Sequence, residues 1–138
     1  MAENEFVKFA TQNLWLIGLA LGSGAMLVWP MLRGSASVSP NEAVTLINHG
    51  ALVLDVREDV EFAMGHITDA RHLPLSQLAS RFNELDKWKD KPVVVNCQSG
   101  MRSAKACAVL KKNGFTQVSN LAGGLAAWQS AKLPVTKG

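Results

Sequence analysis

The sequence predicts an α/β domain with a mostly parallel sheet covered by helices on both faces, preceded by one N-terminal transmembrane helix. Short apolar runs at 51–56, 93–96 and 117–121 alternate with segments of helical pattern, which is typical of parallel strands joined by helices. Residues 14–32 form an uncharged apolar run, close to the roughly 20 residues that a bilayer-spanning helix requires. The first pattern predicts the sheet and the second predicts the membrane helix.

The N-terminal region, residues 1–36, is expected to be a transmembrane anchor (span about 14–32) with a short Gly/Ser linker. Trp15 and Trp29 lie near the ends of the apolar run, as aromatic residues at membrane interfaces do. A cleaved signal peptide is the alternative, but that needs a basic start and a shorter apolar run. We therefore expect an uncleaved anchor, followed by a folded domain at 37–138.

Membrane orientation and self-association have weaker sequence signals. Gly18 and Gly22 form a G-x-x-x-G pair, a spacing that lets two helices approach closely and suggests a weak homodimer. The two cysteines, Cys97 and Cys107, do not resemble the disulfide framework of a secreted domain. The expectation is a single-pass membrane protein with its folded domain on the cytoplasmic side.

The first helix of the folded domain begins at a capping box. Ser39 is the expected N-cap, and Glu42 lies three residues after it, so that the two can bond reciprocally. Gly50 ends this helix. The apolar strand 51–56 follows and carries Asp55 near its carboxyl end, where ligand chemistry gathers in parallel sheets.

Later elements repeat the alternation of helix and strand. They are a helical turn at 59–64, a short strand at 71–73, an amphipathic helix at 76–85, a strand at 93–96, a helix at 102–112, a strand at 117–121 and a last helix at 125–131. Asn113 and Gly114 end the helix at 102–112, since both residues tolerate the conformation that follows a helix.

A cysteine stands between the strand at 93–96 and the next helix. Gly100 permits a sharp turn there, and the amide groups of such a turn favour negative charge. Helix N-termini and a nearby Arg lower a cysteine pKa from about 8.5 to roughly 3.5–7.5. Cys97 is therefore a candidate nucleophile, with Arg102 aimed at an anion; the alternative is a cysteine that packs as a small hydrophobic side chain.

Composition excludes several other functions. The chain has 14 Lys and Arg against 11 Asp and Glu, and these charges are interspersed, so no nucleic-acid partner is expected. No zinc-ligand spacing, P-loop or G-x-G-x-x-G motif occurs, and the three histidines share no metal-ligand spacing. We expect no metal site.

Three separated motifs carry a family resemblance. They are Asp55-Val56-Arg57-Glu58 with Glu61-Phe62, Gly65-His66-Ile67, Ala70 and Pro74; Cys97-Gln98-Ser99-Gly100-Met101-Arg102-Ser103; and Gly114-Phe115 with Val118, Leu121, Gly123-Gly124 and Trp128. On these motifs, the chain from about Val38 to Pro134 resembles the single-domain rhodanese-like proteins. The resemblance implies the rhodanese-like version of the predicted parallel sheet.

The resemblance also implies a sulfurtransferase that needs no metal or organic cofactor. Cys97 would take sulfur from a small anionic donor such as thiosulfate, hold it as a persulfide, and pass it to a thiol or protein acceptor. The substrate-binding residues it implies are Gln98, Ser99, Gly100, Met101, Arg102 and Ser103. Asp55, Arg57 and His66 match the family pattern, and we interpret them as structural supports of the site.

Two other functions compete with this interpretation. Phosphatases of related folds hold one more residue between their Cys and Arg than the four that separate Cys97 from Arg102, and the tighter loop suits a sulfur atom better. A non-catalytic, membrane-tethered interaction module is the second alternative, in which the cysteine is incidental. Retention of Cys97 together with Gly100 and Arg102 favours the enzyme.

Overall fold

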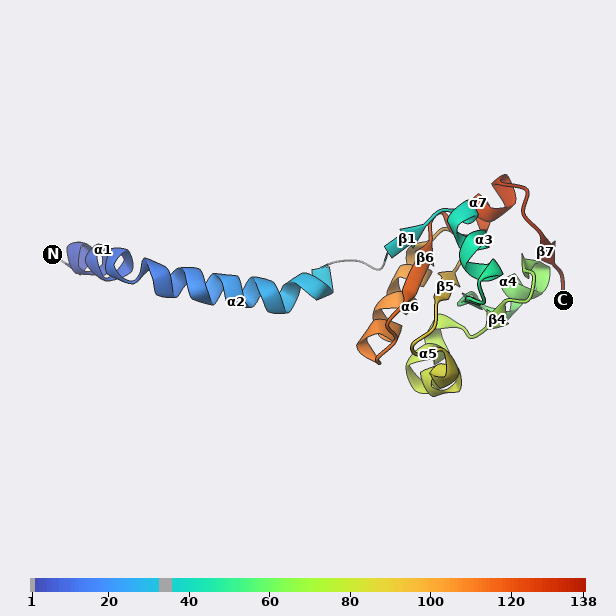
Figure 1. The fold of residues 1–138 in the computed structure, drawn as a ribbon, viewed down its shortest axis with the longest axis horizontal. Helices are drawn as coiled ribbons and strands as arrows, with labels where there is room; N and C mark the ends of the chain where they lie inside the picture. Colours follow the sequence, from blue (N-terminus) through green and yellow to red (C-terminus); the bar gives the residue numbers. More distant parts are fainter. Residues whose placement is uncertain (1, 33–35) are drawn as a thin grey trace. The chain divides into compact units, whose positions relative to one another are not determined.

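The computed structural model describes residues 2–32 and 36–138. The chain divides into two compact units, Met1–Gly34 and Ser35–Gly138, and Figure 1 draws both as ribbons. Of the predicted Gly/Ser linker, residues 34 and 35 lie outside the described residues.

Two helices make up the N-terminal unit, α1 (Ala2–Gln12) and α2 (Leu14–Leu32). Between them, the Asn13 side chain donates a hydrogen bond to the carbonyl of Phe9 at 2.8 Å. A membrane span requires roughly 20 apolar residues in one helix, and within residues 2–32 and 36–138 no helix is both long and apolar enough. The transmembrane helix predicted over 14–32 is therefore not supported.

A five-stranded parallel sheet forms the centre of the second unit, in the order β1-β6-β5-β2-β4. Its strands are β1 (Ala36–Val38), β2 (Leu52–Asp55), β4 (Arg71–His72), β5 (Val93–Asn96) and β6 (Val118–Leu121). The predicted parallel α/β sheet is thus confirmed. A separate antiparallel pair joins β3 (His66–Ile67) to β7 (Val135–Thr136).

Helices cover the sheet on both faces, as the sequence predicts. They are α5 (Leu75–Arg81) and α6 (Met101–Lys112) on one face, and α3 (Pro40–Asn48) and α7 (Gly124–Ser130) on the other. Helix α4 (Asp59–Met64) has no fully buried residue and contacts β3. Alternate residues of β5 point to opposite faces: Val95 packs in one buried cluster with Leu78 of α5 and Leu110 of α6. Val94 packs in the other, with residues of α3 and α7.

Local details differ from the sequence expectation at three places. Ala36 to Val38, expected in the linker and at the start of the domain, pairs with β6 as an edge strand; three residues are too few to show the alternation that marks a strand. The helix expected at 76–85 ends at Arg81 and continues as a 3₁₀ helix, η1 (Phe82–Trp88). The two-residue strands β3 and β7 were not predicted.

The register of the sheet positions the site. Asp55 at the end of β2 pairs with His72 of β4 and with Asn96 of β5. Because all these strands are parallel, their carboxyl ends meet at one edge of the sheet. Cys97 follows Asn96 directly, so it lies at the same edge as Asp55, as expected from the sequence.

Candidate active site

The Cys97 loop, residues 97–103, runs from the end of β5 into the first turn of α6. Gly100 has a φ of 105° and is the N-cap of α6, a left-handed conformation that favours glycine. Its carbonyl accepts a hydrogen bond from the Asn120 side chain at 3.0 Å. The turn expected from the sequence is present, and a residue of the neighbouring strand β6 fixes it.

The sulfur of Cys97 is held from two sides. The Gly100 amide donates to it at 3.0 Å, and the Ser103 hydroxyl oxygen lies 3.3 Å away. The Ser103 hydroxyl donates to Asn120 Oδ1 at 2.6 Å. Since Ser103 is fully buried and Cys97 is only 1% exposed, this arrangement is a positioned thiol at the floor of the loop.

Two opposing effects set the pKa of the Cys97 thiol. Burial raises the pKa, while the hydrogen bond with the Ser103 hydroxyl and those from the amides of Ser103, Gly100 and Ser99 lower it. The hydrogen bonds together outweigh the burial, so the pKa lies below the ordinary thiol value. The direction agrees with the sequence expectation, and the largest lowering effects come from hydrogen bonds within the loop.

Helix α7 supports the loop from below. The amide of Leu125 donates to the carbonyl of Cys97 at 2.8 Å, and that of Ala126 donates to the carbonyl of Gln98 at 3.2 Å. Gly124 has a φ of 60°, and a Cβ there would lie 2.6 Å from the Cys97 carbonyl oxygen. Only glycine fits this contact, so the Gly123-Gly124 turn sets how closely α7 approaches the loop.

Arg102 does not present a free cation to the loop. Its Nη1 and Nη2 donate to the two carboxylate oxygens of Glu61 at 2.6 and 2.8 Å. The hydrogen bond from Arg102 lowers the pKa of Glu61 to about 2, despite an opposing effect of burial. The amide of Glu58 also donates to Glu61 at 3.2 Å. The residue expected to bind an anion is thus already paired with one.

A second arginine pair lies deeper at the same edge. Arg57 Nη2 donates to Asp55 Oδ2 at 2.8 Å and to the Gly65 carbonyl at 2.7 Å, and Arg57 Nε lies 3.0 Å from Asp55 Oδ1. Asp55 is 0% exposed and Arg57 2%. Both side chains therefore belong to the buried interior of the site.

His66 lies beside this pair, in strand β3. Its ring stacks on Phe62 with centroids 3.7 Å apart, and its Nδ1 lies 2.9 Å from the Phe62 carbonyl. Phe62 stacks on His72 as well, at 4.4 Å. Neither this aromatic stack nor the position of His66 in a strand was predicted from the sequence.

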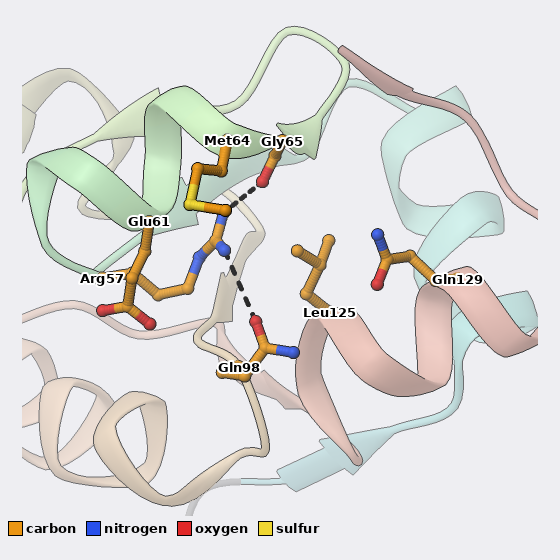
Figure 2. Close-up of a pocket in the computed structure, with 7 residues that line it drawn as sticks. All are labelled: Arg57, Glu61, Met64, Gly65, Gln98, Leu125 and Gln129. Carbon is orange, nitrogen blue, oxygen red and sulfur yellow. Dashed lines mark hydrogen bonds between the residues drawn. The ribbon is translucent and has the colours of Figure 1, made fainter. Parts of the chain in front are cut away.

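Gln98 lines a pocket of about 250 Å³ next to the loop. Figure 2 shows the pocket between α4 and α7, with the Gln98 side chain turned toward Arg57; its Oε1 lies 3.5 Å from Arg57 Nη1. The pocket residues are Arg57, Glu61, Met64, Gly65, Gln98, Leu125 and Gln129. Ser99 and Met101 are exposed at the surface of the loop. In the part of the chain that the structure describes, no three His, Cys, Asp or Glu side chains gather as a metal site would require.

Three contributing residues were not singled out from the sequence. Asn120 could have been found, because it pairs with Val95 in the parallel register of β5 and β6 and so reaches the same edge. Gly124 belongs to a quoted motif, but its closeness to Cys97 depends on tertiary packing. Glu61 pairs with a residue 41 positions away, and no local pattern indicates that pair.

Comparison with known proteins places this geometry in a family. The family model described as "Rhodanese-like domain" matches residues 39–131. Thiosulfate sulfurtransferase GlpE of Ectopseudomonas mendocina is 38% identical over 93 residues, 67% of this chain and 84% of the relative. Uncharacterized protein YqhL of Bacillus subtilis is 50% identical over 78 residues, and the match covers 56% of this chain and 60% of that relative's length.

A solved structure has a similar fold. The rhodanese-related protein of Thermoplasma volcanium superposes with a TM-score of 0.67 at 31% identity, over 73% of this chain and 97% of that chain. Family and fold comparisons thus agree over the unit that contains the Cys97 loop.

Proposed function

Because the chain belongs to the rhodanese-like family, we propose that it is a sulfurtransferase that carries sulfane sulfur on Cys97. The observation that supports this proposal most strongly is the buried Cys97 sulfur. It lies 3.0 Å from the Gly100 amide, in a loop whose hydrogen-bond donors lower the thiol pKa. The Ectopseudomonas mendocina relative is named a thiosulfate sulfurtransferase, which supports thiosulfate as one donor.

The proposed reaction is a double displacement. The Cys97 thiolate attacks the outer sulfur of thiosulfate, the S–S bond of the donor breaks, and sulfite leaves with the bonding electron pair. The product is a Cys97 persulfide. An acceptor thiolate, or cyanide in an assay, then attacks the outer sulfur and releases the Cys97 thiolate. Atoms and electrons balance without any added oxidant or cofactor.

The loop supplies what both steps require. Each step places negative charge on sulfur at Cys97, and fixed amide donors stabilise such charge without reorganising. Gly100 and Ser103 already hold the resting sulfur. The N-terminus of α6 adds its partial positive charge in the same place.

Mass spectrometry after thiosulfate treatment tests the proposal. We expect an adduct of about 32 Da, the mass of one added sulfur, on the wild-type protein and on Cys107→Ala, and no adduct on Cys97→Ser. Absence of the adduct from the wild type would contradict the proposal and favour an interaction module. Efficient hydrolysis of an aryl phosphate without sulfur transfer would favour a phosphatase.

A further inference from the structure

The charge at the mouth of the Cys97 loop differs from what an anion-binding loop needs. Arg102 is the cation of that loop, and both terminal nitrogens are engaged by Glu61, at 2.6 and 2.8 Å. Such a fork-to-fork pair is strong and geometrically specific. As a result, the net charge of the Arg102 side chain and its partner is zero.

The second arginine at this edge offers no replacement. Arg57 is 2% exposed and paired with Asp55, and its Nη2 also donates to the Gly65 carbonyl. An incoming anion would have to separate a guanidinium from its carboxylate to gain a full cation. At the Arg102 pair, it would also leave Glu61 ionised beside it, because the pKa of Glu61 is about 2.

Sulfur donors differ in how much they depend on a free cation beside the Cys97 loop, because they carry different negative charges. Thiosulfate brings two negative charges toward a thiolate and leaves as the sulfite dianion. A persulfide brings at most one negative charge on its reacting group. When the persulfide is protonated, the Cys97 thiolate takes the outer sulfur with its proton and the donor's thiolate leaves, so the balance again needs no other reactant.

Building on the proposed sulfur transfer, we propose that Glu61 is a specificity-determining residue that neutralises Arg102 and so selects persulfide donors over dianionic donors such as thiosulfate. Glu61 acts through Arg102 rather than on the reacting sulfur. Its position is itself fixed, since the Glu58 amide donates to Oε1 at 3.2 Å and the first turn of α4 favours an acidic residue.

The test uses Glu61→Gln in the full chain. Glutamine keeps the shape and the acceptor for the Glu58 amide but removes the charge. We expect the KM for thiosulfate to fall about tenfold, which corresponds to the electrostatic effect of one neighbouring charge. The gain should shrink as salt is raised. The KM for the persulfide of N-acetylcysteine methyl ester, which carries no other charge, should change less than about twofold.

Glu58→Gln is the matched control. It removes the same charge from the start of the same helix. Glu58 is exposed and acts on Arg102 only through space, whereas the ion pair of Arg102 is with Glu61. Its KM for thiosulfate should fall by less than about twofold, because solvent and salt screen an unpaired exposed charge. Glu61→Asp keeps the charge on a shorter side chain that cannot engage both guanidinium nitrogens, and we expect a thiosulfate KM between those of wild type and Glu61→Gln.

Two results would overturn the inference while leaving the proposed function in place. One is an unchanged or higher thiosulfate KM in Glu61→Gln when the protein still forms the Cys97 persulfide, which would make Glu61 purely structural. The other is an equal effect of Glu58→Gln, which would indicate only a general field. Failure of the wild type to form a persulfide with either donor would instead overturn the proposed function, and the inference with it.

Discussion

Two arginine–carboxylate pairs lie at the carboxyl edge of the sheet, and they differ mainly in burial. Asp55 and Arg57 are 0% and 2% exposed, and the Asn96 side chain adds a contact of 3.4 Å to Asp55. The side chains of Arg102 and Glu61 are 36% and 34% exposed. Both pairs have bidentate geometry, so geometry alone does not separate their roles.

Burial decides what each pair can do. Separating a buried pair leaves an uncompensated charge without water, which costs several kcal/mol. Water can replace a partner at the exposed pair, so breaking that pair costs the folded protein little stability. We therefore call Asp55–Arg57 the framework pair, because it is fixed in the interior, and Glu61–Arg102 the mouth pair, because it lies partly exposed beside the Cys97 loop.

The largest expected effect comes from breaking the framework pair. Asp55→Asn leaves the Arg57 guanidinium buried without its counter-charge, and should lower the free energy of unfolding by about 3–5 kcal/mol. Urea unfolding measures this. Glu84→Gln, which breaks the exposed Arg81–Glu84 pair, is the control and should leave stability within error. Equal stabilities for the two variants would remove the distinction between framework and surface pairs.

The framework also includes the turn under the loop, and Gly124→Ala tests that part. A Cβ at Gly124 meets the Cys97 carbonyl oxygen at 2.6 Å and sits at a φ of 60°. We expect a loss of about 2–4 kcal/mol in the free energy of unfolding from overpacking and backbone strain, measured by urea unfolding, together with a clear drop in persulfide formation.

Gly114→Ala is the control for Gly124→Ala, because it introduces backbone strain without a contact to the Cys97 loop. Gly114 has a φ of 93°, but a Cβ added there would have no neighbouring atom within 4 Å, so this variant carries only the backbone cost of about 1–2 kcal/mol. Persulfide formation by Gly114→Ala should stay at the wild-type level. Loss of activity in both variants would mean that stability, rather than the position of the loop, controls the reaction.

Ser103 is a buried residue that contacts the reacting thiol directly. Ser103→Ala removes the hydroxyl that lies 3.3 Å from Cys97, and we expect the thiol pKa to rise. A hydrogen bond to a charged group contributes about 1.5–3 kcal/mol, so persulfide formation at neutral pH should fall about tenfold. The rate should recover as pH increases, whereas the exposed Ser80→Ala should keep the wild-type pH profile. A uniform loss at every pH would contradict a pKa effect.

The difference between the two pairs also shows how far the sequence could lead. The Cys97 loop was predictable because its strand, its glycine turn and its helix are contiguous from Val93 onward. Asp55 could be placed at the same edge by the parallel register alone. The Glu61–Arg102 pair could not be predicted, since it depends on how α4 packs near the start of α6. Arg102 indicates an anion at the start of its helix, but Glu61 by itself resembles an ordinary acidic residue in a first helical turn.

The smallest expected effect is the stability that the mouth pair contributes. Glu61 has a pKa of about 2 in the folded protein, below its ordinary value of 4.5, so its stabilising effect is full above pH 4.5 and is lost as pH falls toward 2. Because the pair is about one-third exposed, we expect Glu61→Gln to cost only about 1 kcal/mol at neutral pH. Unfolding of both proteins along a pH series should show the difference closing between pH 4.5 and 2. A difference in the free energy of unfolding that persists unchanged at low pH would arise from packing of the Glu61 side chain rather than from its charge.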